Sequence, residues 1–296
     1  MNVKLSRQII FASGLLLLMG LLASLDAAGN TFERGLLWQI EKPGKPPSYL
    51  FGTMHIEDPE VVTLAAPVQK AFDKADSVTL EVVLDPQSLL AMATAFMLND
   101  GSTLESHIGS QLYQRSVKAM AAHGMPEMMV ARMKPWAVAV TLMTPPPETG
   151  VVLDLMLYQE ATAQGKPVFG LETPMEQMSL FDSFSESDQI ALLKDTLDHM
   201  NEIPQMFADL KAAYLDRDLA RLVKVSDESM QDNNPGLVNE INRKLIVERN
   251  HRVLERMQPL LKNGRQFIAV GALHLPGEEG LLNLLSEMGY SVTAVY

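Results

Sequence analysis

The sequence of 296 residues contains no cysteine. This absence excludes a disulfide framework, a thiol nucleophile, a thiolate metal site and an acylated lipoprotein terminus. The folded chain must therefore be stabilised by its apolar core, and hydrophobic residues make up 47% of the sequence, which is enough for a sizeable one. Any metal ion would have to be bound by histidine and carboxylate side chains.

The chain also lacks an excess of positive charge, since 24 lysines and arginines face 36 aspartates and glutamates, for a formal net charge of -12. An acidic surface repels nucleic acid and anionic lipid, so neither is expected as a partner. The sequence has no G-x-S-x-G, no Walker motif, no dinucleotide fingerprint and no H-E-x-x-H. Serine hydrolases, NTPases, Rossmann dehydrogenases and zincins therefore have no support.

Only one long apolar run is present, over residues 9–25. Lys4 and Arg7 precede this run and small residues follow it, which is typical of a secretory signal peptide. We expect residues 1–28 to be that signal peptide, with an uncleaved N-terminal anchor as the alternative reading. The rest of the chain would then be exported, either periplasmic or secreted, or anchored to the membrane by its N-terminus.

Short apolar strands are predicted toward both ends of the chain, and helical periodicity dominates between them. The predicted strands are residues 36–41, 48–52, 77–84, 166–171, 266–271 and 290–295. Neither end could bury its apolar faces alone, so strands from both ends should share one sheet. We predict an α/β fold with a central mixed sheet. A single domain over residues 29–296 would carry a helical insertion at about 86–165 and 176–258.

One four-residue pattern, G-x-x-H, occurs twice. Residues 52–55 (Gly-Thr-Met-His) follow one predicted strand, and residues 271–274 (Gly-Ala-Leu-His) follow another. In both cases a buried strand ends in a glycine, and a histidine comes three residues later. Open α/β sheets bind ligands beyond the carboxyl ends of their strands. His55 and His274 are therefore expected to converge on one site.

Two glutamates occupy comparable positions. Glu81 lies inside an otherwise apolar strand, where a carboxylate is costly unless it is paired or binds a cation. Glu172 comes directly after the predicted strand at 166–171. Two histidines with one or two carboxylates suit Zn, Mn, Co or Fe, with a position left open for water. A metal bound in this way acidifies its water and polarises a carbonyl group.

Plainer interpretations of the same residues stay open. A histidine after a strand is often an ordinary turn residue, and Glu81 could form a structural ion pair with an arginine such as Arg249. Without any metal, His55 and Glu81 could still carry out acid–base hydrolysis.

Separate motifs of different composition run along nearly the whole chain after the leader. They are L-F-G-T-M-H-I-E-D-P at 50–59, L-E-V at 80–82, K-P-W at 134–136, Asp154, G-L-E-T at 170–173, E-Q at 176–177, R-N at 249–250, V-G-A-L-H-L-P-G at 270–277 and G-L at 280–281. In this order the motifs resemble the TraB/PrgY/GumN family, to which the animal TIKI proteins belong.

The resemblance implies an α/β fold akin to the erythromycin-esterase and ChaN-like group. For the TIKI branch it also implies a metal-dependent protease that uses the two G-x-x-H histidines and a glutamate. On this sequence those roles fall on His55, His274 and Glu81. Glu172 and Arg249 are further candidates for a ligand or a substrate clamp.

We therefore predict an exported metal-dependent hydrolase, a peptidase that acts on a peptide or protein substrate. His55, His274 and Glu81 would hold a divalent metal such as Mn, Co or Zn, and Arg249 would contact the substrate. Glu81 or Glu172 would serve as the base. Two alternatives stay open: a non-catalytic protein that sequesters a peptide or another ligand, and a metal-free hydrolase that uses histidine and glutamate.

Overall fold

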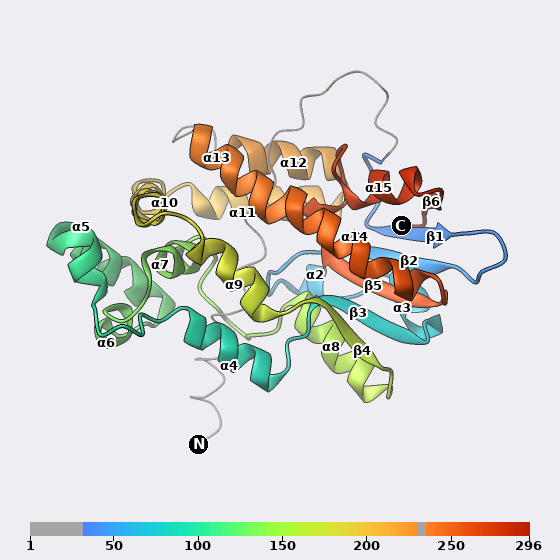
Figure 1. The fold of residues 1–296 in the computed structure, drawn as a ribbon, viewed down its shortest axis with the longest axis horizontal. Helices are drawn as coiled ribbons and strands as arrows, with labels where there is room; N and C mark the ends of the chain where they lie inside the picture. Colours follow the sequence, from blue (N-terminus) through green and yellow to red (C-terminus); the bar gives the residue numbers. More distant parts are fainter. Residues whose placement is uncertain (1–31, 230–234) are drawn as a thin grey trace. The chain divides into compact units, whose positions relative to one another are not determined.

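The computed structural model describes residues 32–229 and 235–296 (Figure 1). The predicted signal peptide, residues 1–28, lies outside the described residues. No helix in the described ranges is both long enough and apolar enough to cross a membrane. The chain divides into two compact units. A sheet unit contains the described parts of residues 32–84, 151–172 and 206–296, and a helical unit contains Asp85–Gly150 and Thr173–Gln205.

The described part of the sheet unit is built on a six-stranded sheet in the order β4-β3-β5-β2-β1-β6 (Figure 1). Strands β4, β3, β5 and β2 run parallel, whereas β1 pairs antiparallel with both β2 and β6. The strands are β1 (Leu37–Glu41), β2 (Ser48–Thr53), β3 (Ser77–Val82), β4 (Val168–Glu172), β5 (Gln266–Gly271) and β6 (Ser291–Ala294). The predicted α/β fold, with a mixed sheet that joins both ends of the chain, is confirmed because β2 pairs with β5 and β1 with β6.

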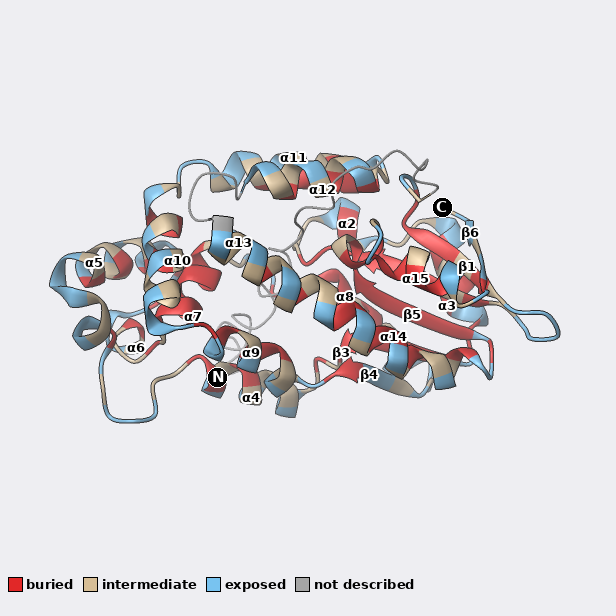
Figure 2. Ribbon diagram, turned by 45° about the horizontal axis from the view of Figure 1, so that its top comes forward, coloured by how far each residue is buried: buried red, intermediate tan, exposed pale blue. Residues whose placement is uncertain are grey.

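The core of the sheet unit lies around its central strands. Every residue of β3 and β5 is buried, as expected for parallel strands covered on both faces (Figure 2). The Phe267 ring of β5 lies 5.8 Å from the Phe51 ring of β2 and 5.2 Å from the Phe72 ring of helix α3 (Ala66–Lys74). Such aromatic contacts bury a large apolar area and fix α3 against the sheet.

Helix α14 (Glu248–Leu261) carries two polar residues, Arg249 and Asn250, into the interior of the sheet unit. Its apolar residues Val253, Met257 and Leu261 recur at every fourth position and are buried. Arg249 stands one turn before Val253 on the same stripe and is buried with it. The other helices of this unit are α2 (Pro59–Val62), α8 (Leu153–Ala163), α11 (Ile203–Leu215), α12 (Leu219–Glu228), α13 (Pro235–Asn242) and α15 (Leu281–Glu287), with short turns at η3 (Arg243–Val247) and η4 (Ala272–His274).

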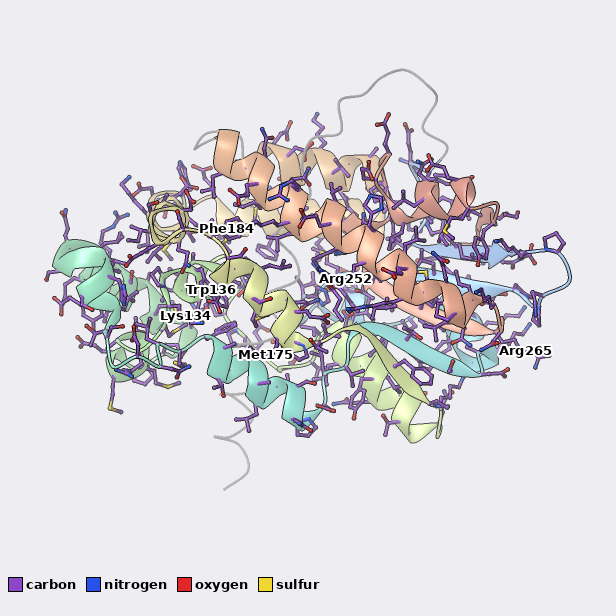
Figure 3. The ribbon with its side chains drawn as sticks, viewed as in Figure 1. Lys134, Trp136, Met175, Phe184, Arg252 and Arg265 are labelled. Carbon is purple, nitrogen blue, oxygen red and sulfur yellow. The ribbon has the colours of Figure 1, made fainter. Side chains whose placement is uncertain are left out.

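The helical unit packs around a fully buried tryptophan. Trp136 stacks on Phe181 at 5.0 Å between ring centroids, and its indole nitrogen donates to Asp182 Oδ1 at 2.8 Å. Lys134 pairs with the same carboxylate, so the K-P-W motif has a structural role in this unit (Figure 3). The helices are α4 (Pro86–Ala95), α5 (Leu104–Met120), η2 (Ala121–His123), α6 (Glu127–Val130), α7 (Pro135–Leu142), α9 (Pro174–Asp182) and α10 (Glu186–Asp198).

Candidate active site

The two G-x-x-H segments pack directly against each other at the carboxyl edge of the parallel strands. Thr53 at the end of β2 is paired with Gly271 at the end of β5. A Cβ atom at Gly52 would lie 2.8 Å from Leu275 Cδ1 and 3.1 Å from Ala272 Cα. These separations are tighter than ordinary side-chain contacts, so glycine at position 52 lets the second segment approach without being displaced.

His55 is buried just beyond the end of β2, and an aspartate lies behind its ring. The Nδ1 atom of His55 is 2.8 Å from Asp154 Oδ2, and the Thr53 hydroxyl donates to Asp154 Oδ1 at 3.1 Å. Both ring nitrogens of His55 and Asp154 Oδ2 are buried and make no well-formed hydrogen bond to a described residue, so the 2.8 Å contact is a close pairing of His55 with Asp154. Burial lowers the pKa of His55, but Asp154 and the more weakly acting Glu81 outweigh it, so the pKa lies above 6.5.

His274 is buried in the turn η4, and an asparagine lies behind its ring. The Nδ1 atom of His274 is 2.6 Å from Asn250 Oδ1, and the Asn250 amide nitrogen donates to the Glu279 carbonyl at 2.6 Å. Burial, with help from the positive charge of Arg249, lowers the pKa of His274 to about 4. The ring is therefore neutral at physiological pH, as a metal ligand or an acceptor of protons must be.

Glu81 is a buried carboxylate that faces His274. Its Oε1 accepts a hydrogen bond from Arg249, its Oε2 accepts the Gly271 N–H at 2.9 Å, and its Oε2 lies 4.0 Å from His274 Nε2. Burial raises the pKa of Glu81, but the charges of Arg249, His274 and His55 outweigh burial and bring it to about 2. Glu81 is therefore ionised, and its ion pair with Arg249 is present in the structure.

Glu172, at the end of β4, is held between two arginines of α14. Its Oε2 accepts from Arg249 Nε at 2.8 Å and Nη2 at 2.6 Å, and its Oε1 accepts from Arg252 at 3.1 and 3.2 Å. Arg249 also donates to the Leu245 carbonyl at 3.2 Å, so all three of its nitrogens are engaged within the protein. The charges of Glu81 and Glu172 outweigh burial and raise the pKa of Arg249.

The structure brings the five residues singled out in the sequence into one buried network: His55, Glu81, Glu172, Arg249 and His274. The two histidines also influence each other, because the charge of His55 lowers the pKa of His274. Their catalytic, metal-binding and substrate-binding roles stay predictions. What the geometry establishes is that all five lie at the carboxyl ends of β2 to β5 and at the start of α14.

Three further residues belong to this network and had no predicted role. Asp154 and Asn250 stood out only as parts of the family motifs, and Arg252 did not stand out at all. Arg252 is one turn after Arg249 on α14, and its side chain is 31% exposed, so it is the network's contact with solvent (Figure 3). Its spacing of three residues from Arg249 was the available signal, since such residues share a helix face.

The chemistry of the donor atoms, though not their present spacing, suits a divalent metal. Both imidazoles have Nδ1 against an oxygen atom, which leaves Nε2 as the donor, and His55 Nε2 is buried without a partner in the described residues. The third donor is less ready, because both Glu81 oxygens accept hydrogen bonds from the protein. Accordingly, no three histidine, aspartate or glutamate side chains in the described ranges are grouped closely enough to enclose a metal.

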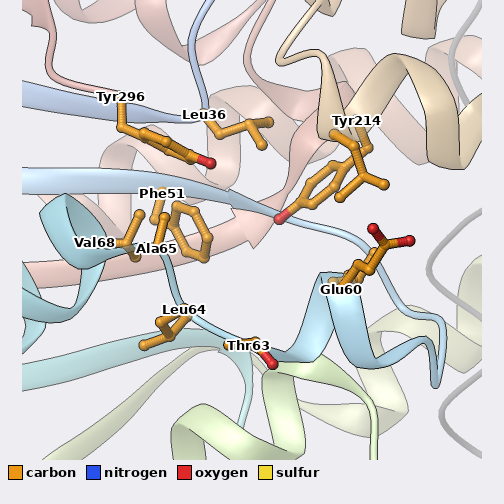
Figure 4. Close-up of a pocket in the computed structure, with 11 residues that line it drawn as sticks. Leu36, Phe51, Glu60, Thr63, Leu64, Ala65, Val68, Tyr214 and Tyr296 are labelled. Atoms are coloured by element: carbon orange, nitrogen blue, oxygen red, sulfur yellow. The ribbon is translucent and has the colours of Figure 1, made fainter.

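A separate apolar pocket opens near the first G-x-x-H segment of the sheet unit. Its lining includes Phe51, Leu64 and Val68, with Tyr214 and Tyr296 at its sides (Figure 4). None of the predicted site residues lines it. The Tyr214 hydroxyl donates to the Gly52 carbonyl at 2.9 Å, which ties one wall of the pocket to the G-x-x-H turn.

The fold and the site define an α/β protein with paired histidines and buried carboxylates at the carboxyl ends of parallel strands. The profile of the TraB/PrgY/gumN family matches residues 36–294. This chain belongs to the TraB/PrgY/gumN family. No solved structure matches the chain, so the expected likeness to the erythromycin-esterase and ChaN-like fold stays a prediction.

Relatives come from animals and bacteria. The chain is 27% identical over 313 residues to Metalloprotease TIKI2 of Danio rerio, covering 86% of this chain and 60% of the relative. It is 28% identical over 314 residues to Metalloprotease TIKI1 of Homo sapiens, covering 86% and 61%. It is 25% identical over 256 residues to the protein YbaP of Escherichia coli (strain K12), covering 83% and 90%. The matched region thus spans about three fifths of these two TIKI relatives.

Proposed function

We propose that this chain is an exported metal-dependent hydrolase that cleaves peptide bonds in a peptide or protein substrate. One observation carries the proposal. Two buried imidazoles, His55 and His274, each have an oxygen against Nδ1, and the free Nε2 of His55 has no partner among the described residues. Such an arrangement is typical of metal-binding histidines. The animal relatives are named metalloproteases, which supports the same chemistry.

In this proposal His55, His274 and Glu81 hold the metal, which is Mn, Co or Zn. The metal, when bound, activates a water molecule and polarises the scissile carbonyl. Glu81 offers its Oε2 atom, which already faces His274 Nε2 at 4.0 Å. Its low pKa keeps this carboxylate ionised and available as a donor at physiological pH.

The arginines supply the positive charge of the site. Arg249 is fixed between Glu81 and Glu172, so its guanidinium can stabilise negative charge that develops on a substrate carbonyl without reorganising. Glu172 accepts from arginines on both oxygens, and we assign it to hold Arg249 rather than to accept a proton. Arg252 is the more exposed of the two arginines and is the better placed to meet a substrate group.

Export is part of the proposal and is supported by residues 1–28. Their cationic start, apolar middle and small residues at the end are what a secretory leader requires. Fractionation of cells that produce the full-length protein tests this part directly. The protein should be found outside the cytoplasm, and its N-terminal sequence will show whether the leader is removed.

Elemental analysis and peptide digestion test the metal chemistry. Purified protein should contain a divalent metal and should cleave peptides in a mixed library, and a chelator should stop the cleavage. His55→Ala and His274→Ala should each lose bound metal and activity by more than the roughly 10- to 100-fold that a supporting residue costs. His199→Ala is the matched control, because His199 is an exposed histidine paired with Asp195. Full metal content and activity in both site variants would refute the proposal.

A metal-free hydrolase is the second candidate, and the His55–Asp154 pair favours it. An imidazole backed by a carboxylate at 2.8 Å is also the arrangement of a general base, and Asp154 raises the pKa of His55. The two candidates differ in one readout. Cleavage that persists in excess chelator and after removal of all metal supports the metal-free reaction.

A further inference from the structure

Two buried residues lie behind the imidazoles, Asp154 behind His55 and Asn250 behind His274. We propose that Asp154 and Asn250 are positioning residues that fix His55 and His274 in the same tautomer, with the proton on Nδ1 and the lone pair on Nε2. This inference rests on the proposed function, since it explains how two histidines from distant segments come to offer equivalent donor atoms.

Asp154 is held by a hydrogen bond on Oδ1 and faces the His55 ring with Oδ2. It is buried in the first turn of α8, where the helix N-terminus stabilises a negative charge. The Thr53 hydroxyl donates to Oδ1, and His55 Nδ1 lies 2.8 Å from Oδ2. A carboxylate oxygen accepts hydrogen bonds, so we assign to the facing Nδ1 of His55 the proton that completes this 2.8 Å contact. Thr53 and His55 leave the same strand two residues apart, which sets the position of both contacts.

Hydrogen bonds from its amide nitrogen fix the orientation of the Asn250 side chain. Its amide nitrogen donates to the Glu279 carbonyl at 2.6 Å and to the His274 carbonyl at 3.4 Å. Both acceptors are main-chain oxygens, so the amide group cannot be turned round without facing oxygen to oxygen. The side-chain oxygen of Asn250 therefore faces His274 Nδ1 at 2.6 Å, and this ring nitrogen must be the donor.

The two supports differ in charge, and the difference predicts unequal imidazoles. A carboxylate behind an imidazole makes the opposite nitrogen a stronger donor than a neutral amide does. His55, backed by Asp154, should therefore bind a metal more strongly than His274, backed by Asn250. Loss of Asp154 should accordingly weaken metal binding more than loss of Asn250.

Nitrogen NMR of the metal-free protein tests the tautomers without reference to activity. Long-range proton–nitrogen spectra of the labelled protein, recorded in alkaline buffer where both rings are neutral, distinguish protonated from unprotonated ring nitrogens. His55 and His274 should each show a protonated Nδ1 and an unprotonated Nε2. A protonated Nε2 on either ring overturns the inference, even if the protein binds metal.

Substitutions then test whether the supports act through the imidazoles. Asp154→Asn should release the His55 tautomer and weaken zinc binding by roughly 10- to 100-fold, measured by competition with a chelating dye. Asn250→Leu should release the His274 tautomer with a smaller loss of zinc binding. Asp195→Asn is the control, because it removes the carboxylate beside exposed His199 and should change neither readout.

The outcomes separate this inference from the proposed function. The positioning roles hold if both wild-type rings carry the proton on Nδ1 and Asp154→Asn releases the His55 tautomer. They hold even if the protein binds no metal and cleaves no peptide, because that result refutes only the proposed function. Unchanged His55 tautomer and zinc affinity in folded Asp154→Asn overturn the positioning role. If Asp154→Asn does not fold, Thr53→Val takes its place, since it keeps Asp154 but frees Oδ1, and its zinc affinity should fall by a smaller factor.

Discussion

At the residue scale, the site is a network of buried charges in which Glu81 and Glu172 depend on arginines. Arg249 pairs with Glu81 and with Oε2 of Glu172, and Arg252 pairs with Oε1 of Glu172. Buried ions are costly to transfer from water, so a network of this kind tolerates the loss of a partner poorly. Its value lies in placing fixed charges at the reacting groups rather than in the stability of the fold.

Removal of the central cation should therefore be severe. Arg249→Gln leaves Glu81 and Glu172 facing each other inside the protein, and the free energy of unfolding should fall by about 3–5 kcal/mol. Urea unfolding measures the loss. Arg221→Gln, which removes an exposed arginine, is the control and should stay within about 0.5 kcal/mol of the wild type. Equal losses in the two variants would mean that the buried network carries no such energy.

The buried histidine His274 predicts an acid-sensitive fold. Its pKa is about 4 in the folded protein and 6.5 in a model peptide, so the unfolded chain binds the extra proton first as the pH falls. Stability should therefore be lost between about pH 6.5 and 4, by at most roughly 1.4 kcal/mol per pH unit. Glu81, with a pKa of about 2 against 4.5, should extend the loss below that range.

Comparison with His274→Gln measures this contribution, because the variant keeps a polar side chain without a titrating group. The wild-type free energy of unfolding, determined in urea from neutral pH to pH 4, should fall more steeply than that of the variant. His55 works in the opposite direction above pH 6.5, since its raised pKa adds stability as it becomes protonated. Parallel curves for wild type and variant between pH 6.5 and 4 would contradict the assigned pKa of His274.

At the scale of secondary-structure elements, the site depends on how closely two strand ends approach. Gly52 is the contact, since the second G-x-x-H segment occupies the space where its side chain would lie. Each strand alone delivers one histidine, and only the parallel pairing of β2 with β5 brings the segments together. The candidate site thus depends on the sheet topology as much as on the identity of its residues.

Gly52→Ala tests this contact. The added methyl group should push the two segments apart, lower the free energy of unfolding by about 1–3 kcal/mol and weaken zinc binding. Gly44→Ala is the comparison, because Gly44 has a positive φ in the turn between β1 and β2 and nothing lies near its Cβ position. That variant should be destabilised by about 1–2 kcal/mol from backbone strain, with zinc binding unchanged. Zinc affinity that is equally unaffected in both variants would rule out the proposed contact.

The strands were the feature of the fold most readily predicted from the sequence. Parallel strands buried on both faces appear as short apolar runs, and all six predicted strands overlap the observed ones. The glycine at each strand end identified where the histidines would lie. By contrast, Asp154 and Asn250 reach the histidines from helices distant in the chain, and no periodicity or spacing predicts which helix starts will contact a given strand end. Tertiary packing decides that, so the supporting groups needed the structure.

At the scale of the whole molecule, metal binding should be coupled to stability. A ligand that binds only the folded state stabilises it by about 2.7 kcal/mol at 100 times its Kd. Added zinc or manganese should therefore raise the thermal midpoint of the wild type, and a chelator should reverse the rise. The double variant His55→Ala/His274→Ala should show no metal-dependent shift. An equal shift in the double variant would place the metal elsewhere on the acidic surface.

The family match spans both units of the chain, whereas the candidate site lies in one of them. The family profile covers residues 36–294, which include both units, whereas the five candidate residues all lie in the sheet unit. The helical unit has its own buried core around Trp136. The charged groups of the proposed chemistry therefore all come from the sheet unit.

X-ray absorption spectroscopy of the zinc-loaded protein tests the central claim most directly, because it counts imidazole ligands at the metal. The wild type should show two imidazoles in the zinc coordination shell, and His55→Ala and His274→Ala should each show one. A shell without imidazole, or one that keeps two imidazoles in both variants, would contradict the claim that these two histidines meet at a single metal-binding site.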